Sequence, residues 1–278
     1  MIVTITGASG FIGRALNARL SAAGHRVETH SARSPRPLAI SDAVVHLAGE
    51  PIAQRWTVAA KRRIRESRVE GTRRLIAALP APPRVFVCAS AVGFYGSRGD
   101  EWLTETSAPG ADFLAEVSVE WERAAAEARA LGTRVVSLRS GMVLGRGGGA
   151  LARMLPAFRM GVGGRLGSGL QFTPWIHLED LLDLVEFTLA NEAVSGPLNA
   201  VAPEPATNRE FTAALGRALA RPAVLPVPAF ALKALFGEMA TVLLASQRVA
   251  PRAALDAGFE FRHPELSAAL QDLLRSNR

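Results

Sequence analysis

The sequence is poor in the residues that build disulfide frameworks, metal clusters and membrane spans. Among its 278 residues Cys88 is the only cysteine, so no internal disulfide can form and we expect a reducing, cytoplasmic location. No run of about 18 apolar residues occurs, which predicts no membrane span and no membrane partner. Met1 leads straight into an apolar strand pattern without a basic segment, which argues against a secretory signal. No His, Cys, Asp and Glu spacing typical of metal sites is present, and we expect no metal.

Lysine is scarce as well, so the basic character of the chain comes from arginine. Lys61 and Lys233 are the only lysines among 32 basic residues, which face 25 acidic ones and leave a net charge of +7. No basic stripe interleaved with aromatic residues and no zinc-finger spacing occurs, so we expect no nucleic-acid partner. A small ligand that carries phosphate suits this balance better.

The chain does contain a regular alternation of short apolar runs and helical patterns up to about residue 145. Such repeats predict βα units, hence an α/β fold with a Rossmann-type, doubly wound parallel sheet. The expected strands are 2–5, 27–30, 43–46, 85–89 and 135–138. The expected helices between them are 11–23, 59–79 and 115–131.

After residue 145 the pattern changes to glycine-rich segments and short helices separated by prolines. Two further strands, 173–177 and 197–201, are expected around a helix at 178–190, and an amphipathic helix is expected at about 264–275. We predict a Rossmann domain over 1–145, with 173–201 completing its sheet. Residues 146–172 and 202–278 are expected to form a smaller, mostly helical C-terminal substrate lobe.

A glycine-rich turn lies between the first expected strand and the first expected helix. Residues 6–13 read T-G-A-S-G-F-I-G. Gly7 permits the tight turn, Gly10 lets the backbone approach a pyrophosphate, and Gly13 lets helix and strand pack closely. The helix N-terminus offers N–H groups to the anion, whereas the alternative is a glycine-rich turn without a ligand. The expected dinucleotide contacts are Gly7, Ser9, Gly10, Phe11, Ile12 and Gly13.

The end of the second strand decides between NAD and NADP. NAD-binding proteins place an acidic residue there, but this chain has His30, Ser31, Ala32 and Arg33. An arginine can bind a 2′-phosphate through two nitrogens, so Arg33 predicts NADP(H). The alternative is that Arg33 is one of many arginines on a solvated loop.

The third strand ends in small residues. Residues 42–50 read D-A-V-V-H-L-A-G-E, and Leu47, Ala48 and Gly49 leave room for the adenosine and ribose of a dinucleotide. Ligands of open α/β sheets bind at these carboxyl ends. This segment is therefore a second prediction of cofactor binding.

The motifs T-G-A-S-G-F-I-G, H-L-A-G and V-C-A-S-A-V-G-F-Y-G resemble the extended short-chain dehydrogenase/reductase superfamily. This resemblance implies a serine and a Tyr-x-x-x-Lys pair that exchanges a proton. The chain departs from that pattern, because Tyr95 is its only tyrosine and Gly99 lies four residues further on. Alignment on Glu122 places Leu114 at the tyrosine position and Ser118 at the lysine position.

Three residues then remain as expected catalytic groups. Ser90 matches the family's serine, with Ala91 as the alternative alignment, and Ser118 replaces the lysine. Arg68, in R-V-E-G-T, stands where members have asparagine, and its alternative is a structural arginine bonded to loop carbonyls. The expected substrate contacts are Glu50, Tyr95, Gln171, Trp175 and His177. A satisfied buried histidine is the alternative for His177.

One atypical subgroup is similar to the chain from end to end. The matching segments include A-G-E-P-I (48–52), R-G-D-E (98–101), P-W-I-H-L-E-D (174–180), S-Q-R-V-A-P (246–251) and G-F-E-F-R-H-P-E-L (258–266). Its members are labelled epimerase family protein, sugar nucleotide epimerase or cell-division inhibitor, labels that rest on fold analogy.

Two functions follow from this resemblance. The first is an NADP(H)-binding oxidoreductase or epimerase of atypical mechanism that acts on a small substrate, anionic ones included. The second is a non-catalytic, NADPH-binding regulatory protein, for example in cell division. We expect a monomer or a homodimer.

Overall fold

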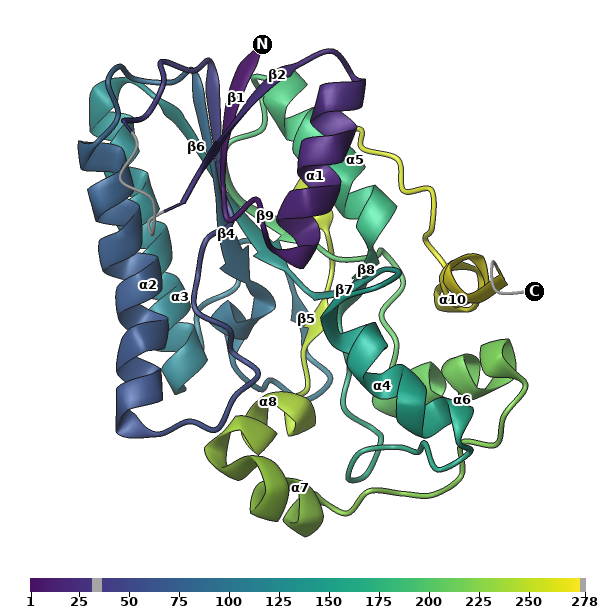
Figure 1. Ribbon diagram of the computed structural model, residues 1–278. Helices are drawn as coiled ribbons and strands as arrows, with labels where there is room; N and C mark the ends of the chain where they lie inside the picture. Colours follow the sequence, from purple (N-terminus) through teal and green to yellow (C-terminus); the bar gives the residue numbers. More distant parts are fainter. Residues whose placement is uncertain (32–36, 276–278) are drawn as a thin grey trace.

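Six parallel strands form the centre of the molecule in a computed structural model that describes residues 1–31 and 37–275 (Figure 1). Their order is β2-β1-β3-β4-β6-β9. Their bounds are Arg26–His30 (β2), Ile2–Thr6 (β1), Ala43–His46 (β3), Val85–Ala91 (β4), Arg134–Ser140 (β6) and Gly196–Ala200 (β9). The chain starts at β1, adds β2 on one side and then crosses to β3 on the other, which is the doubly wound arrangement. The switch between β1 and β3 is where such sheets bind ligands.

Helices cover both faces of the sheet (Figure 1). One face carries α1 (Phe11–Ala22) and α5 (Leu178–Ala190), and the other carries α2 (Val58–Ala77) and α3 (Phe113–Ala126). Because both faces are covered, the inner strands are largely apolar and almost entirely buried, with a few buried polar residues such as Thr4 and Arg139. Ile5 packs in one core with Leu16 of α1, and Phe86 packs in the other with Trp121 of α3.

The expected fold class is confirmed, and the expected bounds hold to within one to three residues for most elements. The segment 173–177 differs from its expectation, because only β8 (Trp175–His177) is a strand and it pairs with β7 (Met142–Leu144) outside the central sheet. Gly141 explains this departure, since a Cβ on it would lie 2.7 Å from the Pro174 carbonyl oxygen. The close approach lets Met142 donate a hydrogen bond of 2.8 Å to that oxygen, so the chain leaves the sheet here.

The C-terminal lobe has its own apolar core. Its three larger helices, α4 (Gly149–Arg159), α6 (Asn208–Leu219) and α10 (Leu266–Leu274), pack Leu151, Phe211 and Leu270 together. The remaining elements of the lobe are short: α7 (Ala229–Phe236), α8 (Ala240–Leu244), α9 (Arg252–Asp256), and β10 (Arg248–Val249), which pairs with β5 (Trp102–Leu103). Among the described residues, no helix combines the length and apolar character that crossing a membrane requires.

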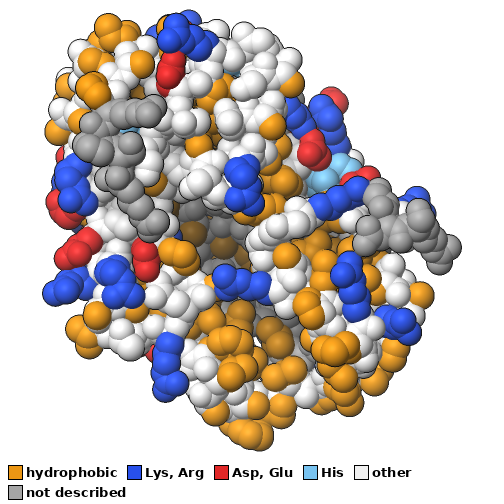
Figure 2. All heavy atoms as spheres, viewed as in Figure 1, with side chains coloured by type: hydrophobic (Ala, Val, Ile, Leu, Met, Phe, Trp, Pro, Cys, Tyr) orange, Lys and Arg blue, Asp and Glu red, His pale blue; other side chains and the backbone are white. Residues whose placement is uncertain are grey.

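An apolar cluster joins the lobe to the sheet domain. It contains Trp56, Ile64, Val117 and Met239, with partly buried neighbours such as Leu114. Next to it, Lys61 of α2 forms an ion pair with Glu238 of the lobe. Figure 2 shows the surface hollowed between the two parts, with hydrophobic side chains in the hollow and Lys and Arg side chains at its edges. The carboxyl ends of the sheet strands face this junction.

Candidate functional site

The turn between β1 and α1 is shaped by backbone contacts that leave no room for side chains. Gly7 has a φ of +76°, and a Cβ there would lie 2.8 Å from the backbone nitrogen of Ala48. A Cβ on Gly13 would lie 2.2 Å from the Gly7 carbonyl oxygen. Gly10 is the N-cap of α1 and no side chain caps it, so the first amides of the helix remain available to an anion. The turn therefore fits the pyrophosphate of a dinucleotide.

Neighbouring segments support this turn. Arg14, in the first turn of α1, donates a hydrogen bond of 2.7 Å to the carbonyl oxygen of Ser9. The Phe11 ring lies against the glycine run that opens the lobe, since a Cβ on Gly148 would come within 2.2 Å of it. Ile12 packs against the core of the sheet. The sequence predicted Phe11 and Ile12 as contacts of the dinucleotide but not Arg14. The position of Arg14 in the first turn of the helix could have indicated that its side chain reaches back to the turn.

The third strand ends directly against the turn. The Leu47 amide donates a hydrogen bond of 3.1 Å to the carbonyl oxygen of Thr6. A side chain at Gly7 would collide with backbone atoms of Leu47 and Ala48. Below them His46 is buried, with Nδ1 2.6 Å from the Thr6 hydroxyl. Burial, helped by the charge of Arg68, lowers the pKa of His46 to about 4, so this ring is neutral. Arg33 lies outside the described residues.

Arg68 projects from α2 onto the end of β3. A Cβ on Gly49 would lie 3.2 Å from its Cζ, and its guanidinium lies 5.0 Å from the centre of the Trp121 ring. Nη1 donates to the carbonyl oxygens of Glu50 (3.0 Å) and Ile64 (3.2 Å). Burial lowers the pKa of Arg68 to about 10, while the charge of Glu50 opposes the shift, so the group stays cationic at neutral pH.

The contacts of Arg68 agree in part with each of its two predicted roles, catalytic and structural. The bonds from Nη1 to carbonyl oxygens match the structural alternative. Nη2 and Nε, however, hydrogen-bond to nothing among residues 1–31 and 37–275, and Nη2 would lie 3.3 Å from a Cβ on Gly49, about as near as Nη1 at 3.4 Å. Glu50, expected to contact substrate, accepts from Gln54 (3.1 Å) and lies 3.5 Å from Arg63.

Ser90 belongs to a buried ion pair. Its hydroxyl donates to Glu122 Oε1 at 2.7 Å, and Glu122 accepts two bonds of 2.8 Å from Arg139 of β6. Burial alone would lower the pKa of Arg139, but the hydrogen bonds and charge of Glu122 raise it above its ordinary value. Ser90 itself is 4% exposed. In this arrangement it is a donor to a structural carboxylate.

Tyr95 belongs to the same network. Its side chain is fully buried, its hydroxyl donates to Asn199 Oδ1 at 2.7 Å, and it accepts from Arg139 at 3.0 Å. Burial raises the pKa of Tyr95. The hydroxyl of Tyr95 is therefore satisfied inside the protein by Asn199 and Arg139, and its contact with substrate stays a prediction.

The two relay positions lie on the first turns of α3. Leu114 sits beside the segment that follows β4, where a Cβ on Gly93 would be 3.3 Å from the leucine Cβ. It also belongs to the apolar cluster between lobe and sheet domain. Ser118, one turn further, is 4% exposed. An apolar side chain and a buried hydroxyl thus stand where a tyrosine and a lysine would exchange a proton.

Three expected substrate contacts in the second half of the chain lie in the interior. Trp175 is 1% exposed in the core of the lobe. Gln171 donates to the carbonyl oxygens of Leu166 (3.0 Å) and Leu243 (3.4 Å), so it ties two lobe segments together. His177 is the N-cap of α5, whose Nδ1 accepts from the Glu179 amide at 3.1 Å. In this structure Gln171 and Nδ1 of His177 have internal partners, and substrate contact by these three residues stays a prediction.

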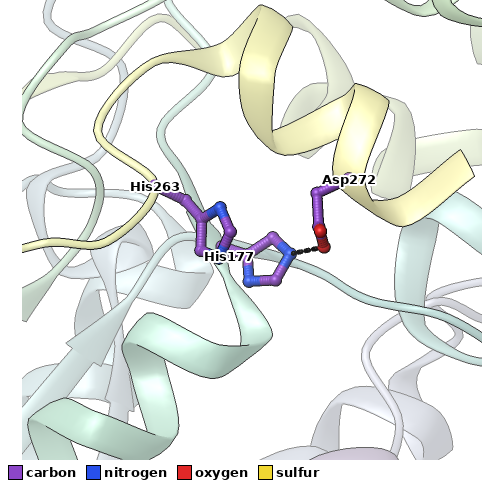
Figure 3. Close-up of side chains that lie close together, drawn as sticks. All are labelled: His177, His263 and Asp272. Carbon is purple, nitrogen blue, oxygen red and sulfur yellow. Dashed lines mark ion pairs between the residues drawn. The ribbon is translucent and has the colours of Figure 1, made fainter. Parts of the chain in front are cut away.

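His177, His263 and Asp272 form a group with the composition of a metal site (Figure 3). The two rings stack with centroids 3.8 Å apart, and Nε2 of His177 lies 3.5 Å from an Asp272 oxygen. Because Nδ1 of His177 accepts a hydrogen bond, the neutral ring carries its proton on Nε2, which then points at the carboxylate. A metal at Nε2 would displace this proton. The neutral ring would then carry its proton on Nδ1, which could no longer accept from the Glu179 amide and cap α5. The group is thus better described as a capping cluster than as a ligand set.

Two sequence models match the chain. The model of the NAD dependent epimerase/dehydratase family covers residues 3–200, and that of a domain of unknown function, DUF1731, covers residues 227–273. Epimerase family protein Mb2239 of Mycobacterium bovis is 44% identical over 97% of this chain and 96% of its own length. Human epimerase family protein SDR39U1 is 42% identical over 99% of this chain and 100% of its own length.

Solved structures agree with these sequence matches. The crystal structure of human SDR39U1 with NADPH superposes with a TM-score of 0.93 at 39% identity, covering 99% of this chain and 100% of that one. A nucleoside-diphosphate sugar epimerase from Corynebacterium glutamicum superposes with a TM-score of 0.78 at 37% identity, covering 99% of this chain and 58% of that one.

The buried ion pair yields a test of stability. Replacing Arg139 by methionine leaves Glu122 uncompensated in the interior, and we expect a loss of about 3–5 kcal/mol in the free energy of unfolding, measured with urea. The double variant Arg139→Met, Glu122→Leu removes both charges and should recover most of this loss. If the double variant is as unstable as the single one, an uncompensated Glu122 charge does not cause the loss of stability.

The two neutral histidines yield a test of pH dependence. His46 and His177 have pKa values lowered from 6.5 to about 4, by burial in both rings and, in His177, also by the charge of His263. The unfolded chain therefore takes up protons first as the pH falls, so their contribution to stability is complete above pH 6.5 and declines toward pH 4.

Asparagine at position 177 keeps a capping oxygen but cannot take up a proton. In His177→Asn the slope of unfolding free energy between these pH values should decrease by up to about 1.4 kcal/mol per pH unit. Above the ordinary histidine pKa, the unfolding free energies of the parent and the variant should depend on pH in the same way. An unchanged slope would show that His177 is not protonated on unfolding.

Proposed function

Since the chain belongs to the NAD dependent epimerase/dehydratase family, we propose that it is an oxidoreductase or epimerase that uses NADP(H) and lacks the Tyr-x-x-x-Lys proton relay. Arg68 carries this proposal. Its guanidinium lies against Gly49, beside the phosphate-binding turn, with only Nη1 engaged by carbonyl oxygens of described residues.

Several groups of the chain suit a bound NADP(H). The amides at the start of α1, with Gly7 and Gly10, can hold the pyrophosphate, and Ala48 and Gly49 leave space along the exit of β3. Arg33 remains the expected partner of the 2′-phosphate. The human relative SDR39U1 was crystallised with NADPH, which supports the same choice here.

A nicotinamide bound at this edge exchanges a hydride with a carbon atom of the substrate. When that carbon is a carbonyl, its oxygen gains negative charge, and Arg68 is positioned to stabilise it through Nη2 and Nε. The proton that completes the new hydroxyl comes from water, because Leu114 and Ser118 at the relay positions offer no group that ionises near neutral pH.

This arrangement favours a particular kind of substrate. An alkoxide formed without an acid is a strong base, whereas the reduced oxygen of a quinone is a phenolate and a much weaker base. The alkoxide formed from a 1,2-dicarbonyl is also less basic than a simple alkoxide, because the neighbouring carbonyl group withdraws electrons. Arg68 can hold a weakly basic oxyanion without transferring a proton, since its pKa is about 10. We therefore favour small conjugated carbonyl compounds, anionic ones included.

A non-catalytic role is the second candidate. Leu114 packs at the tyrosine position within the apolar cluster that joins the lobe to the sheet domain. Ser90 is engaged by Glu122. A protein that binds NADPH and reports it to a partner needs none of these groups to react, and such a protein would bind the nucleotide without turnover.

Cofactor choice can be measured by calorimetric titration with NADPH and NADH. A bidentate bond from Arg33 to the 2′-phosphate is worth on the order of 1.5–3 kcal/mol, so NADPH should bind at least about tenfold more tightly. Arg33→Ala should remove most of this difference. Arg26→Ala, an exposed arginine of β2 paired with Glu28, is the matched control and should preserve it. Equal affinities in the parent protein would contradict the assignment.

The role of Arg68 can be separated from folding by Arg68→Lys. Lysine keeps the charge but loses the planar set of donors. We expect NADPH affinity to change less than about threefold, while NADPH oxidation with a panel of quinones and 1,2-dicarbonyls falls at least about tenfold. Arg65→Lys, on the same helix and paired with Glu120 at the surface, is the control.

Two results would contradict this role. If Arg68→Lys lowers only the urea midpoint and leaves turnover intact, Arg68 is structural. If the parent binds NADPH but oxidises it with no acceptor of the panel, the regulatory alternative gains instead.

A further inference from the structure

The C-terminal lobe carries an exposed apolar surface that its fold does not cover. Val224 is 77% exposed and Phe230 is 75% exposed, values at which an apolar side chain faces water almost completely. We call this surface the lobe patch. It consists of Met160, Val162, Leu170, Val224, Leu225, Phe230 and Leu235.

Backbone contacts bring the segments of the patch together. Leu166 and Val227 form a parallel bridge, and Val227 donates to the Arg165 carbonyl oxygen at 2.8 Å. A Cβ on Gly164 would overlap the Leu225 carbonyl oxygen, so the backbones of these two segments are in contact. Helix α7 follows directly, and Figure 2 shows hydrophobic side chains gathered at this end of the molecule. The patch is therefore one surface rather than scattered residues.

Basic side chains surround the patch. Residues 153–172 and 202–233 contain seven basic residues and two acidic ones. Within the described part of the chain, Arg159, Arg209, Arg221 and Lys233 form no ion pair. Of the two acids, Glu210 belongs to the capping box of α6, and Glu204 forms no ion pair among the described residues. Glu238, just beyond these segments, pairs with Lys61. The margin of the patch thus has positive charge available for an anionic partner.

Charge and shape together identify the partner. A second copy would bring two basic margins against each other, which costs free energy. Figure 1 shows α7 at one end of the molecule, where an extended surface can reach it. We propose that the lobe patch docks on a lipid surface that carries anionic headgroups, with Phe230 and Leu235 inserted among the acyl chains and the basic margin at the phosphates.

This docking differs from a membrane span. The expectation of no membrane partner rested on the absence of a long apolar run, and the patch is assembled from four separate segments that leave no such run. The tertiary structure alone produces an apolar surface of this kind. Surface docking also leaves the sheet domain and its phosphate-binding turn in water.

Co-sedimentation with vesicles tests the proposal. The full chain should sediment with vesicles of phosphatidylcholine mixed with phosphatidylglycerol, and much less with phosphatidylcholine alone. Phe230→Ser, Leu235→Ser should reduce the bound fraction at least about tenfold, and so should Arg159→Gln, Arg221→Gln, Lys233→Gln. The matched control is Ile40→Ser, Val58→Ser, which removes two exposed apolar side chains outside the patch (67% and 88% exposed) and should bind like the parent.

Other outcomes overturn the proposal. Failure of the parent to sediment, or equal binding to both kinds of vesicle, rules out an anionic lipid surface. Size exclusion followed by light scattering, performed on the same variants, tests whether a second copy of this chain covers the patch instead. A dimer that the Phe230→Ser, Leu235→Ser variant abolishes, without vesicle binding by the parent, would show that the patch joins two copies of this chain. Urea midpoints confirm that every variant is folded.

Discussion

The bidentate ion pair between Arg139 and Glu122 is the interaction on which the interior of the sheet domain depends. A guanidinium with 3% exposure can remain charged only if fixed acceptors replace water, and Glu122 supplies two of them at 2.8 Å. The remaining nitrogen reaches Tyr95 and the carbonyl oxygen of Glu105, and the ring of Phe94 lies 3.4 Å below the guanidinium. Four segments of the chain therefore meet at one charge, and each must keep its place for the charge to be satisfied.

This constraint explains why the ends of the strands carry so little conventional acid–base chemistry. Ser90 donates to the carboxylate, and Tyr95 is bonded on both sides by Arg139 and Asn199. The hydroxyl groups of Ser90 and Tyr95 thus satisfy a buried carboxylate, a buried amide and a buried guanidinium. What remains at the edge of the sheet is Arg68, on a helix that faces Gly49, and the amides of the phosphate-binding turn.

The lobe follows the same principle with different groups. His177 caps α5, and Gln171 joins the segment at Leu166 to α8 within the lobe. Asp180 of α5 accepts from the amides of Arg262 and His263, so this carboxylate fastens the C-terminal segment to α5. One end of the lobe stays apolar and basic. The site at the sheet edge and the lobe patch are therefore separate features, one made by backbone at the strand ends and the other by side chains that the fold leaves uncovered.

The sequence by itself determined the sheet, its helices and the phosphate-binding turn, because those features depend on local patterns. Alternating apolar runs specify buried parallel strands, and Gly7, Gly10 and Gly13 are needed wherever backbone meets backbone at less than a side chain's distance. The loss of the relay was also readable, since Leu114 and Ser118 are one helical turn apart. Only the tertiary structure decided the roles of Ser90, Tyr95 and Gln171, because each has a partner distant in sequence. Arg139 and Glu122 carried no local signal, lying on different elements that meet only after the sheet has formed. The lobe patch likewise arises from separated segments, whose exposure depends on what packs over them and not on their own composition.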